Sequence, residues 1–393
     1  MIRKTVFLIL LIIWATACDK DPVIDPDNDT SILNELIVGS GTKSFQRTIG
    51  GQRLDGFHSV KQTKDGGYVF CGFAETDTTS ERAVLLLKTK ANGETIWAKR
   101  LSNSFAAYGW HIEITDDKGY IIAATQSITA ADSANHNYQG LLIKTDANGN
   151  QTWKHSYSFG TYKVRQTNDG GYAVSGNDFN KTNGTVKGIL LRTDASGMEI
   201  WRKTYGGLVE INDMNKTKDG GFILCGIIRA SINSESDIYI VRTNSTGDTL
   251  WTKTYGDASE NTAKAIRETP SGNFVLCGHN ANPGASGYAK LIGANGEQIW
   301  HTDFSEINVQ AIDHISITTD NQFIAVGRNS FGTDNPASLQ KIGSDGNNVW
   351  IKWFNPKIYN LFNEVQQTSD KGFMIAGYTY GEGYIVKTDA DGN

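Results

Sequence analysis

One ten-residue pattern, a tight turn that runs into a tryptophan, returns along the chain at intervals of roughly fifty residues. At residues 144–153 it reads Lys-Thr-Asp-Ala-Asn-Gly-Asn-Gln-Thr-Trp, where Asp, Asn and Gly supply the turn between two strands. A fixed internal repeat indicates one repeat architecture, although 393 residues would also allow several domains. Further copies occupy residues 88–97, 192–201, 242–251, 291–300 and 341–350, and a seventh, at residues 387–393, stops before its tryptophan.

Each repeat contains four strand-like pieces, here called a, b, c and d, which in the first repeat are residues 57–63, 68–72, 83–89 and 95–100. Strands a and b are joined by a turn such as Asp169-Gly170-Gly171, in which Gly accepts the positive φ of a hairpin. Strand a carries an apolar residue five positions before that turn in every repeat, and strand b is almost wholly apolar, which predicts a sheet covered on both faces. The strand a residues are Val60, Ile112, Val164, Met214, Ile266, Ile315 and Val365.

Four antiparallel strands repeated seven times predict an all-β fold, a seven-bladed β-propeller spanning residues 43–393. The last repeat lacks its strand d, whereas residues 44–51 match residues 200–207, with Phe45 in the place of Trp201. We therefore expect blade 7 to combine residues 362–393 with an N-terminal strand at residues 43–51, which closes the ring and leaves no open edge between the ends.

The turn-plus-tryptophan pattern, as in Thr145-Asp146-Ala147-Asn148-Gly149 to Trp153, resembles the tryptophan-docking repeat of PQQ-like propellers. Together with the Asp-Gly-Gly-Tyr turn it is similar to bacterial lipoproteins and secreted proteins built from such repeats. The resemblance covers residues 43–393 and implies the fold, because the shared residues are structural. A PQQ-dependent dehydrogenase would imply eight blades and a pair of adjacent cysteines, which this sequence does not show, so we expect no cofactor.

The N-terminus has the pattern of a lipoprotein signal peptide, residues 1–17. Arg3 and Lys4 precede an apolar run, and Ala15-Thr16-Ala17-Cys18 resembles a lipobox, with Ala15 in the place of the usual leucine, which makes Cys18 the predicted lipidation site. An ordinary secretory signal with an incidental cysteine is the alternative. Residues 19–29 are polar and acidic with two prolines, which predicts a tether over residues 18–42. The expected location is the outer membrane, through the lipid anchor, on the cell surface or facing the periplasm.

The net charge of the chain limits the kinds of partner that it can bind. Removal of residues 1–17 takes away two cations and leaves 35 Lys and Arg against 42 Asp and Glu, or −7. This acidity disfavours nucleic acid as a partner and leaves membrane attachment to lipid alone. We expect a monomer.

Motifs for chemistry are missing from the sequence. Cys71, Cys225 and Cys277 share one repeat position that Ala, Ser or Val fills elsewhere, which favours small buried residues over disulfides. The Asp-rich turns resemble calcium loops only superficially, because a distal bidentate Glu is absent and Lys90, Gly293 and Gly343 replace the first Asp in three copies, so we expect no metal. Neither a nucleophile elbow nor a His pair at metal spacing occurs, and we expect no catalytic residues.

The a/b and c/d turns are short and uniform, whereas the b/c and d/a connections vary and converge on the opposite face of the ring, where binding is expected. Aromatic residues there include Tyr138, Trp353, Tyr359, Phe331 and Phe362; His136 and Asn280 are polar loop residues. Several of the aromatics, Trp353 and Phe362 among them, are equally consistent with packing between blades. The predicted ligand-binding residues are His58, Tyr108, Trp110, His111, Tyr162, Lys163, Asn212, Asp213, Lys264, His279, Asp313, His314, Asn363 and Glu364.

These observations predict a non-enzymatic, lipid-anchored binding module that presents its variable face to a glycan or protein partner in the envelope. Two alternatives stay open. One is an envelope assembly scaffold, analogous to the propeller lipoprotein of the outer-membrane barrel-insertion machinery, which resembles this chain in anchor and tryptophan repeats but has eight blades. The other is a polysaccharide hydrolase or lyase that uses carboxylates from several blades.

Overall fold

The computed structural model describes residues 34–38, 44–50, 55–75, 81–104, 106–127, 129, 138–180, 183–256, 259–281, 285–329, 335–357 and 359–393; of residues 34–38, 103 and 104 it describes the backbone alone. The predicted signal peptide, the lipidation site Cys18 and most of the predicted tether lie outside these residues, as do His136 and Phe331.

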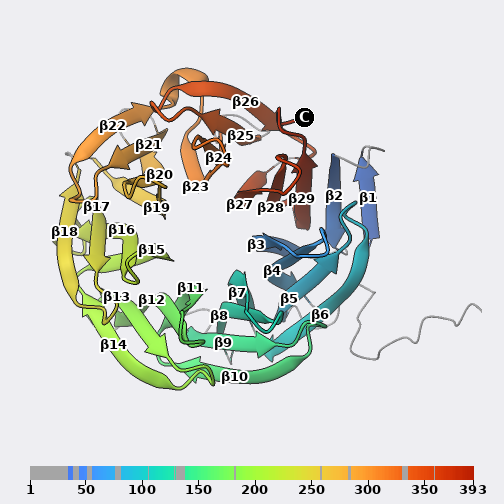
Figure 1. Ribbon diagram of the computed structural model, residues 1–393, viewed down its shortest axis with the longest axis horizontal. Coiled ribbons are helices and arrows are strands. Elements are labelled where there is room, and N and C mark those ends of the chain that lie inside the picture. Colours follow the sequence, from blue (N-terminus) through green and yellow to red (C-terminus); the bar gives the residue numbers. More distant parts are fainter. Residues whose placement is uncertain are drawn as a thin grey trace, which may run out of the picture.

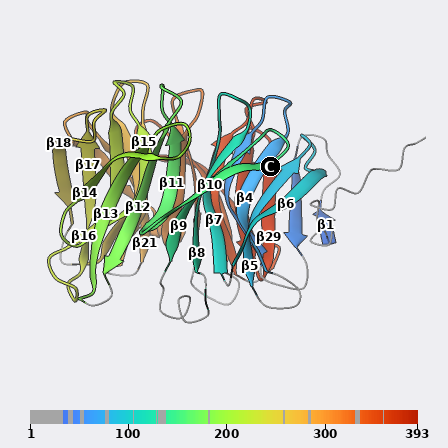
Figure 2. The same cartoon turned by 90° about the horizontal axis from the view of Figure 1, so that it is seen from below.

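The described chain forms seven antiparallel sheets arranged in a ring, as the sequence predicted (Figure 1). In blades 1 to 6 the first strand lies innermost and the later strands follow in chain order toward the rim (Figure 1). Figure 2 shows the ring from the side, with its strands running between the two faces. A 3-10 helix at Ser305–Ile307 joins blades 5 and 6. Within the described residues, no helix is both long and apolar enough to cross a membrane.

The strands of the first three blades are as follows. Blade 1 contains β3 (Asp55–Gln62), β4 (Tyr68–Glu75), β5 (Arg82–Thr89) and β6 (Thr95–Ser104). Blade 2 contains β7 (Ala106–Ile114), β8 (Tyr120–Ser127), β9 (Gln139–Thr145) and β10 (Gln151–Tyr157). Blade 3 contains β11 (Gly160–Gln166), β12 (Tyr172–Asn180), β13 (Thr185–Thr193) and β14 (Glu199–Tyr205).

The remaining blades continue the series. Blade 4 contains β15 (Val209–Lys216), β16 (Phe222–Arg229), β17 (Ser236–Thr243) and β18 (Thr249–Tyr255). Blade 5 contains β19 (Asn261–Glu268), β20 (Phe274–Asn280), β21 (Ser286–Ile292) and β22 (Gln298–Asp303). Blade 6 contains β23 (Ala311–Ile317), β24 (Phe323–Arg328), β25 (Ala337–Ile342) and β26 (Asn348–Phe354). Blade 7 contains β27 (Asn360–Gln367), β28 (Phe373–Thr379) and β29 (Glu382–Thr388), followed by β2 (Phe45–Gly50) and β1 (Asn34–Val38).

Ring closure follows the prediction. Strand β2 pairs antiparallel with β29, with Phe45 opposite Lys387, and so supplies the missing fourth strand of blade 7. Strand β1 then pairs with β2 and makes this blade five-stranded (Figure 1). Residues 34–38 lie in the segment that the sequence assigned to the tether, so ordered structure begins earlier than the composition indicated.

Each strand d tryptophan packs on the c/d turn of the following blade. A Cβ built on Gly149 would lie 2.6 Å from Cη2 of Trp97, and Trp153 covers Gly197 in the same way. These glycines have positive φ, so the turn requires glycine and its bare face receives the indole. At the seam, Phe45 covers Gly93, which confirms that Phe45 takes the tryptophan position.

An ion pair ties strand c to the a/b turn in six blades. Lys144 Nζ, for example, lies 2.7 Å from Asp117 Oδ2. In blade 5 the cation is replaced by Leu291 and the turn carboxylate by Ser271, so both partners are absent together and no unpaired charge is left at this buried position. The pairs are Lys88–Asp65, Lys144–Asp117, Arg192–Asp169, Arg242–Asp219, Lys341–Asp320 and Lys387–Asp370.

Every innermost strand contains a β-bulge at the same repeat position. In β3 the register with β4 shifts between Phe57 and Ser59, so His58 is the extra residue. One extra residue reverses the alternation of a strand, and Phe57 and Val60, three positions apart, accordingly point into the same hydrophobic cluster. The bulge leaves the two intervening side chains, those of His58 and Ser59, free to face the channel and the next blade.

Candidate functional site

The seven bulge residues form one ring at the mouth of the channel, here called the mouth ring. They stand near the start of each inner strand, on the face that carries the variable d/a and b/c connections. All seven are half-buried, and all seven line a single cavity of about 320 Å³. The mouth ring consists of His58, Trp110, Tyr162, Asn212, Lys264, Asp313 and Asn363.

Aromatic rings gather on the side of the mouth formed by blades 1 to 3. The His58 ring is stacked on Trp110, with centroids 4.4 Å apart, and Tyr108 and Tyr162 contact Trp110 at 5.6 and 5.7 Å. Trp110 Nε1 donates a hydrogen bond to Thr125 Oγ1 at 2.8 Å, which fixes the indole. These rings largely stack on one another, so they form a rigid wall and offer less open aromatic face than the sequence indicated.

Polar groups occupy the rest of the mouth. The Asn212 and Asn363 amides donate to Ala263 O and Phe57 O of the following blades, each at 2.8 Å, and His58 Nδ1 likewise donates to Gly109 O at 2.8 Å. These side chains therefore link neighbouring blades at the bulge while lining the cavity. Burial is the main reason that the pKa of His58 falls to about 4, so its ring is neutral at pH 7.

The mouth also holds charged groups. Asp313 pairs with Arg328 at 2.9 Å and Glu210 with Arg229 at 2.7 Å, each within one blade. Burial raises the pKa of Asp313, although Arg328 and Lys264 oppose this effect. Lys163 lines the cavity from below, with Nζ 3.8 Å from Asp213 Oδ1.

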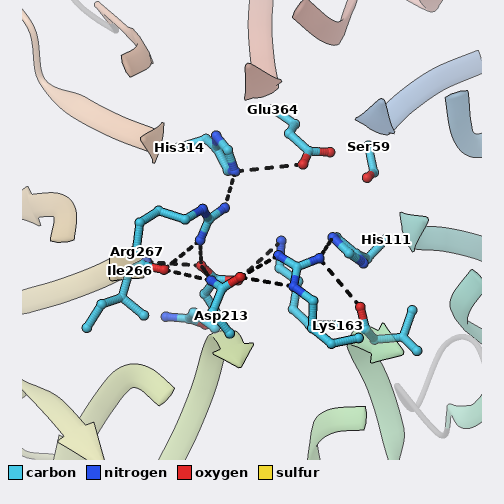
Figure 3. Close-up of polar contacts among 12 residues, drawn as sticks. Ser59, His111, Lys163, Asp213, Ile266, Arg267, His314 and Glu364 are labelled. Atoms are coloured by element: carbon cyan, nitrogen blue, oxygen red, sulfur yellow. Dashed lines mark hydrogen bonds and ion pairs between the residues drawn. The ribbon is translucent and has the colours of Figure 1, made fainter. Parts of the chain in front are cut away.

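A second layer, here called the middle ring, lies one residue further along each inner strand (Figure 3). Its side chains connect to backbone groups of the next blade: Glu364 Oε2 accepts from the Val60 N–H at 2.8 Å, and Asp213 Oδ2 accepts from the Ile266 N–H at 3.0 Å. The ring is almost wholly buried. Its members are Ser59, His111, Lys163, Asp213, Ala265, His314 and Glu364.

Cationic side chains that stand two residues further along the inner strands contact the middle ring. Arg267 contacts both Asp213 and His314 (Figure 3). Arg165 Nη1 lies 2.6 Å from His111 Nε2, and Lys61 Nζ lies 2.5 Å from Glu364 Oε1. Burial raises the pKa of Asp213, but Arg267 and Lys163 outweigh it and hold the value at about 2. The middle ring is therefore a buried network beneath the mouth in which Asp213 and Glu364 are ionised, whereas burial lowers the pKa of His111 and His314 well below the usual range and keeps both rings neutral.

The structure brings eight of the predicted residues into the cavity: the mouth ring and Lys163. His111, Asp213, His314 and Glu364 lie one layer lower, Tyr108 supports Trp110 from the side, and His279 lies at the end of β20. Sequence reasoning missed four residues that line the cavity. They are Asn177, Phe179, Glu210 and Ile211.

Other candidates from the sequence have structural roles. Cys71, Cys225 and Cys277 are free and fully buried, and burial raises the pKa of each thiol. In the c/d turn, Asp146 Oδ1 accepts hydrogen bonds from the backbone N–H groups of Asn148 and Asn150, so this carboxylate stabilises the turn. Over the part of the chain that is described, no group of three or more His, Cys, Asp or Glu is placed to hold a metal ion.

Comparison with known proteins adds to the fold assignment. A scan of protein-family models finds no match, and a search of curated proteins finds none. Among solved structures, Sqt1 from Chaetomium thermophilum bound to the N-terminus of the ribosomal protein L10 has 9% identity and a TM-score of 0.51, covering 86% of this chain and 98% of that one. Another Sqt1 structure from this organism has 10% identity and a TM-score of 0.51, covering 83% of this chain and 80% of that one. A protein of unknown function from Bacteroides caccae has 12% identity and a TM-score of 0.45, covering 72% of this chain and 93% of that one. At these identities the likeness concerns the fold alone: the chain is a seven-bladed β-propeller, a fold suited to binding.

Proposed function

We propose that this protein is a non-enzymatic binding module of the cell envelope, anchored by lipid on Cys18, that receives a glycan or a protein segment at the mouth of its channel. The observation that carries the proposal is the convergence of all seven bulge residues on one cavity. Each comes from a different blade, so the site exists only in the closed ring. A concave site with a few fixed polar groups on a rigid scaffold is the usual form of a ligand pocket.

The lining favours a hydroxyl-rich or peptide ligand over an apolar one. Amides, ammonium groups and carboxylates alternate around the mouth with the aromatic wall of Trp110 and Tyr162. Sugar hydroxyls and peptide groups both donate and accept hydrogen bonds, as these side chains do. The Sqt1 structure contains the N-terminus of a ribosomal protein, which favours a protein segment as the second ligand class.

A polysaccharide hydrolase or lyase is the alternative, and one observation favours it: burial raises the pKa of Asp313, as in a general acid. Against this, Asp313 is paired with Arg328, and the buried carboxylates Asp213 and Glu364 are held at a pKa of about 2 despite their burial. Shortening of sugar chains during incubation with the protein, abolished by Asp313→Asn, would establish the enzyme and contradict a pure binding role.

Retention on immobilised polysaccharides and on immobilised envelope proteins tests the binding role. The variant Trp110→Ala/Tyr162→Ala removes the aromatic wall, and we expect it to lose retention while keeping its fold by circular dichroism. Trp353→Ala is the matched control, because Trp353 is 39% exposed on the outer strand β26, away from the mouth. Unchanged retention of the double variant, or no retention of the wild type by either set, would contradict the proposal.

The envelope location is tested separately. We expect Cys18→Ala to move the protein from the membrane fraction to the soluble fraction, because one acyl-bearing cysteine is the expected attachment. Protease treatment of intact cells then separates a surface binder, which is degraded, from a periplasmic scaffold, which is protected. A membrane-bound Cys18→Ala variant would refute the lipid anchor.

A further inference from the structure

The charges at the mouth are not balanced. Both mouth carboxylates, Asp313 and Glu210, are already paired with arginines of their own blades, at 2.9 and 2.7 Å. Lys264 lines the same cavity and makes no ion pair within the described residues. The mouth of this acidic chain, with a net charge of −5, therefore carries uncompensated positive charge inside a partly enclosed cavity.

Lys163 adds to this positive charge. Its Nζ lies 3.8 Å from Asp213 Oδ1, beyond hydrogen-bond distance, and Asp213 Oδ1 is a buried oxygen without a hydrogen-bond partner among the described residues. The other carboxylate oxygen of Asp213 accepts from Ile266 N–H and from Arg267. Asp213 thus holds Lys163 below the cavity but leaves its ammonium hydrogens available to a ligand.

The two mouth asparagines supply the complementary acceptors. The Asn212 and Asn363 NH₂ groups each use one of their two hydrogens on the backbone oxygens of Ala263 and Phe57, so each side chain keeps its amide oxygen, an acceptor, and one N–H for a ligand at the cavity. Amide oxygens accept from hydroxyl groups, whereas ammonium groups donate to a carboxylate. One small molecule that carries both kinds of group is a sugar acid.

We infer that the ligand is an acidic glycan and that the mouth recognises a hexuronic acid unit, with its carboxylate on Lys264 and Lys163 and its hydroxyls on Asn212 and Asn363. The inference rests on the proposed function and names its ligand class. The cavity, about 320 Å³, lies at the lower end of small-ligand pockets, which fits a single sugar unit whose neighbours lie outside. Trp110 is already stacked on His58, so charge and hydrogen bonds, more than an open aromatic face, select the ligand.

Isothermal titration calorimetry on the full-length chain in detergent tests the inference, with trigalacturonate and the neutral trigalactoside as probes. A charged hydrogen bond is worth roughly a tenfold change in affinity or more, so we expect the acidic trimer to bind at least about tenfold more tightly than the neutral one. Added salt should weaken the binding of the acidic trimer and leave the binding of the neutral trimer unchanged.

Lys264→Gln should remove roughly this tenfold preference and leave the neutral trimer unaffected. Lys154→Gln is the matched control, because Lys154 is exposed on the outer strand β10 and should change neither affinity. Lys264→Arg keeps the charge and should retain the preference. Equal melting temperatures of these variants show that a loss of affinity is not a loss of fold.

Three results would overturn the inference: equal affinity for both trimers, an unchanged preference in Lys264→Gln, or mouth-dependent binding of a peptide with a free C-terminal carboxylate when neither trimer binds. The first and third leave the proposed binding role intact, provided that Trp110→Ala/Tyr162→Ala abolishes the binding that is seen. If the acidic trimer still binds both Lys264→Gln and the double aromatic variant, the mouth is not the binding site, which would contradict both the inference and the proposed function.

Discussion

At the residue scale, the bulge decides which side chains meet. The sequence placed polar residues at the start of each inner strand but could not separate two neighbours such as Asn212 and Asp213 into layers. The structure does so, because the extra residue at the bulge puts Asn212 in the mouth and Asp213 in the buried middle ring. A bulge has no signature in a pattern that otherwise alternates, so this distinction could not be predicted.

Asn177 and Phe179 were missed for a different reason, the variability of the segment that holds them. Asn177 and Phe179 lie at the end of β12, in a segment that varies between repeats and so resembles an ordinary loop in the sequence. The available signal was an aromatic residue, Phe179, in a variable connection between strands b and c; the structure leaves it 49% exposed, as expected of a surface used for contact.

Asp213 gives a prediction about stability. Asp213→Asn leaves Arg267 and Lys163 without their buried counter-charge, and loss of one partner of a buried pair costs about 3–5 kcal/mol. We expect this loss in the free energy of unfolding at pH 7, measured by chemical denaturation. Asp178→Asn, at an exposed position in β12, is the control and should change stability by no more than about 0.5 kcal/mol.

The pH dependence follows from the lowered pKa of Asp213. A carboxyl whose folded pKa is about 2, below its ordinary value of 3.8, stabilises the fold fully above the ordinary value and loses that contribution as the pH falls toward 2. The stability difference between wild type and Asp213→Asn should therefore narrow between pH 4 and pH 2. A difference that is constant over this range would show that Asp213 does not act through its charge.

At the element scale, the repeated turn and its tryptophan form the joint between blades. The sequence predicted both parts, because the turn residues recur at fixed spacing. The structure adds the contact itself: the indole of one blade covers the positive-φ glycine of the next, and Trp251 and Trp300 also donate from Nε1 to turn carbonyls at 3.0 Å. Glycine is therefore required in this turn for two reasons: its φ angle is positive, and the indole leaves no room for a Cβ.

A pair of glycine substitutions separates these two requirements. Gly149 has a φ of +79° and would place a Cβ 2.6 Å from Trp97, whereas Gly170 has a φ of +83° with no atom within 4 Å of its Cβ. Both Gly→Ala changes carry the left-handed cost of about 1–2 kcal/mol, but Gly149→Ala adds an overpacking cost of about 1–3 kcal/mol. In thermal denaturation we expect a lower melting temperature for Gly149→Ala than for Gly170→Ala. Equal falls in melting temperature would mean that the tryptophan contact contributes nothing to stability.

At the scale of the whole molecule, closure of the ring creates the cavity at the channel mouth, because all seven blades contribute to its lining. Several contacts cross the seam between blades 7 and 1 in the channel: Asn363 donates to Phe57 O, and Glu364 accepts from both Val60 N–H and Lys61 Nζ. The missing strand d of the last repeat predicted the role of β2. It could not predict β1, because a fifth strand has no counterpart in the other blades and residues 34–38 follow an acidic, proline-containing stretch that resembles a tether.

Deletion of residues 44–50 tests this closure. Without β2, blade 7 loses its fourth strand and Phe45 no longer covers Gly93, so we expect a large fall in melting temperature together with loss of ligand retention. Deletion of residues 34–38 is the control: β1 lies outside β2, and its removal should leave the ring closed and the mouth functional. A melting temperature unchanged by the first deletion would refute the shared blade.

The most direct test of the central claim is a crystal structure of the full-length chain with trigalacturonate. The account predicts density for a sugar acid at the channel mouth, between Trp110 and Lys264, with the carboxylate at the lysine. Density in the cavity on the opposite face, among Arg192, Lys216 and Lys218, with an empty mouth, would contradict it.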